Sequence, residues 1–162
     1  MTYNELNTVF DTIAVAMGLS YENGPQDQLN TVLREVDTKY PICYSLPFIQ
    51  VFPQKSDFGP EWLNYDMYDV QIAFLDIDGT TKRTPDTNNE EKRSILNAEF
   101  NHAKTFLYNL YEGELAGLVG SSVESVTINP LTIFQGMNGA TGALLEFKIK
   151  TLSTFDCSLV VV

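Results

Sequence analysis

The segment Ala140–Leu152 alternates strictly, and this period of two constrains the fold more than any other feature of the 162-residue chain. Successive side chains of a β-strand point to opposite faces of a sheet, so the alternation predicts a strand with one buried face. The expected buried residues are Ala143, Leu145, Phe147, Ile149 and Thr151, and the expected solvated ones are Glu146, Lys148 and Lys150. A sheet built from such strands needs an apolar layer on one side.

Other segments have the same strand character. Tyr65–Ile77 alternates, with Tyr68, Val70, Ile72 and Phe74 on one face. Ile42–Phe52 is aromatic-rich but contains Pro47, which cannot donate a ladder hydrogen bond, so we expect an edge strand or an interrupted one. Strands are also expected at Val123–Asn129 and Leu131–Met137, on either side of Pro130. The Asn138–Gly139 dipeptide is predicted to form the hairpin turn that leads into the last strand.

Three other segments have apolar residues that recur with the helical period of 3.6 residues. Thr2 and Glu5 form a T-x-x-E capping box for a helix over Thr2–Leu19. A second helix is expected from Pro25 to Asp37, since proline suits a first helical turn. Thr87 and Glu90 predict the start of a long helix that ends at Glu112. Its expected apolar stripe is Ile95, Leu96, Phe100, Ala103, Phe106, Leu107, Leu110 and Tyr111.

The expected element order is therefore α–α–β–β–α–β–β–β. Strands follow one another in groups, which predicts an α+β fold with an antiparallel sheet, β-hairpins, N-terminal helices and the long helix on one face. We expect a single domain over residues 1–162. Within it, the polar segment 79–89 is predicted to be a mobile loop, and residues 153–162 a C-terminal arm that reaches a neighbouring subunit.

Composition excludes several classes of function. The formal net charge of −11 disfavours binding to nucleic acid or to anionic membrane surfaces. No apolar run approaches the ~20 residues of a membrane span, and the N-terminus does not resemble a signal peptide. Cys43 and Cys157 lack a C-x-x-C spacing and are expected to be free thiols in a reducing compartment. With His102 as the only histidine, no zinc site is expected.

One short motif resembles an enzyme centre. The hydrophobic strand segment that begins at Val70 ends in the motif Asp76-x-Asp78-Gly79-Thr80. This motif resembles the first motif of the haloacid-dehalogenase-like (HAD) phosphatases. That resemblance implies a magnesium-dependent phosphohydrolase, with Asp76 as nucleophile and Asp78 as acid/base. The element order and the lack of a later acidic pair favour another interpretation, in which both aspartates end a strand and start a turn. We therefore expect no catalysis, no cofactor and no metal.

The element order as a whole resembles the tail-terminator, tail-completion and head–tail connector (neck) proteins of tailed bacteriophages. The segments that match are Thr2–Leu19, Ile42–Phe52, Tyr65–Ile77, the 79–89 loop, Glu90–Glu112 and Ala143–Lys150. This resemblance implies a structural virion protein, assembled in the host cytoplasm, that forms a homo-oligomeric ring at the head–tail junction or the top of the tail. Its implied partners are copies of itself and other neck and tail proteins.

The sequence also marks residues for contacts between subunits. Phe58 and Trp62 place apolar side chains at a loop tip, and Lys82 and Arg83 lie in the 79–89 loop. The chain ends in Val160, Val161 and Val162, three β-branched apolar residues that suit a strand on an adjacent subunit. These residues are the candidate interface.

Overall fold

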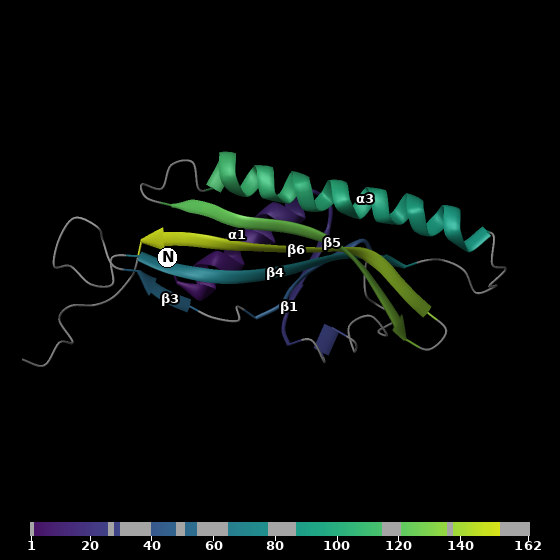
Figure 1. Ribbon diagram of the computed structural model, residues 1–162, viewed down its shortest axis with the longest axis horizontal. Coiled ribbons are helices and arrows are strands. Elements are labelled where there is room, and N and C mark those ends of the chain that lie inside the picture. The colour runs from purple at the N-terminus through teal and green to yellow at the C-terminus, as the bar shows by residue number, and fades with distance from the viewer. Residues whose placement is uncertain are drawn as a thin grey trace, which may run out of the picture.

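The computed structural model describes residues 2–25, 28–29, 40–47, 51–54, 65–77, 87–114, 121–135 and 138–152. It has an α+β fold, as predicted, with two of its helices packed on one face of a sheet (Figure 1). Leu29, in the described part of another helix, packs in a second cluster with Ala73 and Leu75 on the opposite face. The elements are α1 (Tyr3–Ala16), β1 (Ser20–Asn23), β2 (Ile42–Ser45), β3 (Val51–Gln54), β4 (Tyr65–Ile77), α3 (Thr87–Asn109), the π-helical turn η1 (Leu110–Glu114), β5 (Ser122–Gln135) and β6 (Asn138–Leu152).

The sheet has the order β1-β2-β4-β6-β5. Its centre is the antiparallel pair β4–β6, which is in register from Tyr65↔Leu152 to Ile77↔Ala140. β5 pairs antiparallel with β6. β1, a short strand that the sequence analysis did not predict, pairs parallel with β2, so the sheet is mixed rather than purely antiparallel.

The interruption predicted at Pro47 is confirmed. β2 and β3 both pair antiparallel with β4, β2 near Ile72 and β3 near Tyr68. Because β6 occupies the other side of β4 throughout, β2 and β3 follow one another along the same side of β4. Proline breaks this row of pairing where it cannot donate a backbone hydrogen bond.

The main core lies between the sheet and the helices α1 and α3. Phe106 of α3 lies at its centre, with its ring centroid 5.5 Å from that of Phe74 and 5.7 Å from that of Phe10. Phe10 of α1 also meets Phe147 of β6 at 6.3 Å. These edge-to-face contacts attach both helices to the two central strands.

The two N-terminal helices were predicted from their starts. The capping box of α1 is present: the Thr2 backbone N–H donates to Glu5 at 2.6 Å, and the Glu5 N–H donates to the Thr2 hydroxyl at 3.3 Å. For the second helix, Gln28 and Leu29 are helical, and the Leu29 N–H donates to the Pro25 carbonyl at 3.2 Å. The remainder of that predicted helix lies outside the described residues.

The long helix α3 buries the expected face, with two differences. Ala103, Phe106 and Leu110 are fully buried. Tyr111 was expected in the same stripe but is 54% exposed, whereas Glu99, which was not predicted to be buried, is 1% exposed. Among the described residues, no helix is both long enough and apolar enough to span a bilayer.

The C-terminal hairpin corrects two predictions. Pro130 does not divide two strands: β5 is continuous, and Pro130 pairs with Ala143. This is tolerated because β5 is the last strand in the sheet order and needs hydrogen bonds on one side only. Asn138 and Gly139 do not form the turn either, since they pair with Gln135 and Phe134 inside the hairpin. The connection falls on residues 136–137, which lie outside the described residues.

Candidate functional site

Asp76, the first aspartate of the D-x-D-G-T motif, lies near the end of β4 and is half-buried. One of its carboxylate oxygens accepts a hydrogen bond from the Ile77 backbone N–H at 2.8 Å. This bond joins Asp76 to the next residue of β4, and the turn predicted after it falls on residues outside those that the structure describes. Asp78 lies outside the described residues.

The surroundings of Asp76 differ from those of the phosphatase motif. In the described part of the sheet, the strands that pair with β4 are β2, β3 and β6, and each is antiparallel to it. In open α/β sheets, by contrast, ligands bind at the carboxyl ends of parallel strands. The described residues include no group of three or more His, Cys, Asp or Glu side chains placed to hold a metal ion.

A buried carboxyl group lies under α3. Glu99 is almost fully covered, and its Oε2 is 3.1 Å from the Nδ1 of the half-exposed His102. Burial raises the pKa of Glu99 above its ordinary value; the hydrogen bond and charge of His102 act in the opposite direction, and the negative charge of Asp76 raises the pKa further. His102 is thus the hydrogen-bond partner of a buried side chain.

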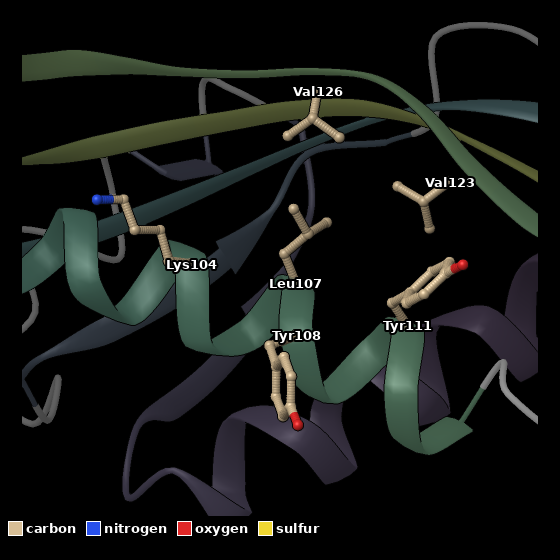
Figure 2. Close-up of a pocket in the computed structure, with 6 residues that line it drawn as sticks. All are labelled: Lys104, Leu107, Tyr108, Tyr111, Val123 and Val126. Atoms are coloured by element: carbon tan, nitrogen blue, oxygen red, sulfur yellow. The ribbon is translucent and has the colours of Figure 1, made fainter.

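An open apolar groove lies between the C-terminal end of α3 with η1 and the first half of β5 (Figure 2). Its volume is about 370 Å³. It is lined by Lys104, Leu107, Tyr108, Tyr111, Val123 and Val126. In Figure 2, the side chains of Leu107 and Tyr111 point toward the strand, while Val123 and Val126 point toward the helix. We call these six residues the α3–β5 groove.

The groove exposes large apolar side chains. Tyr108 is 66% exposed, Tyr111 54% and Val126 41%. Lys104 is the one charged residue in the lining. Small-molecule sites generally combine an apolar lining with several convergent polar groups. An open groove lined in this way is instead typical of a contact surface for another apolar chain.

A β-bulge in β5 forms one wall of this groove. The pairing with β6 passes from Glu124↔Lys148 directly to Thr127↔Glu146, so two residues of β5 oppose one of β6. One of these two, Ser125, has a positive φ of 54°. The bulge bends the strand locally, and the second of the two, Val126, lines the groove. Bulges are common at sheet edges, where they change the direction of a side chain.

The free side of β5 lies beside the groove. In the described part of the sheet β5 has β6 as its single neighbour. An unpaired strand side presents a row of N–H and C=O groups that another strand can bind. Apolar side-chain sites and free backbone groups therefore lie next to each other on this part of the molecule.

The interface residues predicted from sequence fall outside the part of the chain that the structure describes. They are Phe58, Trp62, Lys82, Arg83, Val160, Val161 and Val162. Sequence reasoning missed the α3–β5 groove. The one sequence signal for the groove was Tyr111, an aromatic residue at the end of the apolar stripe of the long helix. Helical spacing alone does not distinguish a buried core residue from an exposed contact residue at that position.

No protein-family model matches this sequence, and no curated protein matches it significantly. The fold and the geometry of the α3–β5 groove are therefore the features from which a function is inferred.

Proposed function

We propose that this protein is a structural subunit that assembles with copies of itself into a ring, at the head–tail junction or the top of the tail of a tailed bacteriophage. The observation that carries the proposal is the exposed α3–β5 groove beside the outermost strand of the sheet. A subunit that is completed by its neighbours needs such a surface, because apolar groups and strand edges left in solvent favour uncontrolled association.

The order of elements supports the phage assignment. A helix packed on a mainly antiparallel sheet, after an N-terminal helix and before a long hairpin, is the arrangement implied by the resemblance to neck and tail-terminator proteins. The net charge of −11 suits the same role, since an acidic ring repels DNA and lets it pass without binding. The proposed location is the virion, and the further partners are other neck and tail proteins.

Self-association of a groove variant tests the proposal. Val126→Glu places a negative charge in an apolar groove of an already acidic chain. We expect it to weaken assembly at least about 30-fold, the equivalent of a 2 kcal/mol interface hot spot. Light scattering after size exclusion, over a range of protein concentrations, measures the effect.

Val15→Glu is the matched control. Val15 is 61% exposed on α1 and does not line the groove. It adds the same charge at a site that the proposal does not use, so assembly should persist. Equal losses in both variants would assign the effect to net charge and contradict a role for the groove.

The alternative function is a magnesium-dependent HAD-like phosphohydrolase that uses Asp76 and Asp78. It keeps one observation in its favour, the position of Asp76 at the end of a buried strand. Hydrolysis of an aryl phosphate with magnesium, compared between the natural chain and Asp76→Asn, separates the two functions. Turnover that depends on Asp76 would replace the structural proposal.

A further inference from the structure

We propose that the α3–β5 groove binds the apolar segment Leu159–Val162 of a second copy, which lies along the free side of β5. This inference rests on the proposed self-assembly and names the parts that meet. The groove supplies the apolar sites, and the outermost strand supplies backbone donors and acceptors.

The chemistry of the segment fits the groove. Leu159-Val160-Val161-Val162 is uncharged, and three of its four residues are β-branched, the side chains that favour extended backbone. In a strand, Leu159 and Val161 point to one side and Val160 and Val162 to the other. One pair therefore enters the groove while the backbone pairs with β5.

The lengths agree as well. Lys104 of α3 and Tyr111 of η1 mark the extent of the groove along the helix, and at a helical rise of 1.5 Å per residue they lie about 10 Å apart. Four residues of an extended strand also span about 10 Å from the first to the last. Four extended residues therefore match the length of the groove.

The position from which the arm leaves the sheet allows exchange between copies. β6 ends at Leu152, and the nearby Lys150 pairs with Ser122 at the start of β5, so the chain leaves the sheet at the end where the groove lies. The stretch from Leu152 to Leu159 can extend about 23 Å. This exceeds the radius of gyration of about 15 Å expected for a domain of 162 residues, so the arm can reach an adjacent copy.

The symmetry of this contact matches a ring. The donor surface is the arm and the acceptor surface is the groove, so the two sides of the interface are different patches of the same chain. A contact between unlike patches leaves each copy with one free donor and one free acceptor. Such head-to-tail contacts close into rings when the rotation between copies allows it.

Disulfide trapping between two singly substituted full-length chains tests the inference. One chain carries Val126→Cys and the other Val161→Cys, both with Cys157→Ser, while the remaining Cys43 is buried. After mixing and mild oxidation we expect a disulfide-linked dimer, and neither chain alone should give one. A chain that carries both new cysteines and closes the disulfide within itself at high dilution would show that the arm fills its own groove, and would overturn the inference.

Removal of the segment gives a second, independent measurement. A chain that ends at Ser158 should associate at least about 10-fold more weakly than the full chain, which corresponds to 1.4 kcal/mol. If this deletion and the trapping experiment both have no effect while Val126→Glu disrupts the oligomer, the arm is excluded and the proposed function survives. If the unmodified chain is monomeric, the proposed function itself is wrong.

Discussion

At the scale of single residues, Gly142 shows how closely the central strands approach. A Cβ added there would overlap the carbonyl oxygen of Phe74, an atom of the β4 backbone that cannot rotate away. We expect Gly142→Ala to lower the free energy of unfolding by about 1–3 kcal/mol, the usual cost of overpacking, with a corresponding fall in the urea midpoint.

Gly113→Ala is the control for that substitution. No atom lies within 4 Å of the position that its Cβ would take. We expect a change within about 0.5 kcal/mol, as is usual at exposed sites. An unchanged urea midpoint for Gly142→Ala would contradict the close approach of β6 to β4.

The buried Glu99 predicts a dependence of stability on pH. Burial raises its folded-state pKa above the ordinary 4.5, so the folded state holds this proton more tightly than the unfolded chain does. Protonated Glu99 therefore stabilises the fold at a pH below the ordinary pKa of 4.5, and this stabilisation is lost as the pH rises through the folded-state pKa. Glu99→Gln cannot ionise and should gain in Tm relative to the natural chain between pH 4 and pH 7.

Thermal unfolding at several pH values checks this expectation. Glu90→Gln, an exposed change on the same helix, controls for the loss of one negative charge. A Tm difference for Glu99→Gln that falls from pH 4 to pH 7 would show that the ionised form is favoured in the fold, contrary to the argument from burial.

At the scale of elements, Phe106 is the side chain through which α3 contacts both the sheet and α1. We expect Phe106→Ala to destabilise the fold by about 3–5 kcal/mol, because it leaves a cavity between three packed elements. Thr105→Ala, at the exposed neighbouring position, should have little effect. Equal urea midpoints for the two variants would contradict the assignment of Phe106 to the core.

The sequence predicted those elements whose pattern is local. The alternation of Ala143 to Thr151 predicted β6 and its buried face, and the capping box at Thr2 predicted the start of α1. It failed where tertiary pairing overrides local preference. Asn138–Gly139 is a favourable turn, but the pairing of β6 with β4 and β5 places the connection at 136–137. Pro130 was interpreted as a break because its position on the outside of the sheet is not visible in the sequence.

The candidate site was less predictable than the fold. The α3–β5 groove depends on where η1 and the bulge at Ser125 and Val126 come together, and these elements are separated in the chain. Tyr111 was expected to be a core residue because it continues the stripe of Leu107 and Leu110. Its side chain does point toward β5 (Figure 2), but it lines an open groove and is left exposed.

At the scale of the whole molecule, two properties act against each other. The net charge of −11 makes copies of the chain repel one another, whereas in the proposed assembly the α3–β5 groove and the free side of β5 hold copies together. Association of acidic chains through an apolar contact is selective, because a partner that does not fit the groove meets only the repulsion. This balance suits a subunit that stays separate until it meets the correct neighbour.

The native mass of the unmodified protein tests self-assembly most directly. We expect one closed species at an integer multiple of the 18.2 kDa chain mass, with a central channel in electron micrographs. Its size should stay constant as the concentration rises, because a closed ring has no free ends. A typical interface has a Kd of about 1 μM, so a protein that is still a monomer at about 100 μM would contradict the account.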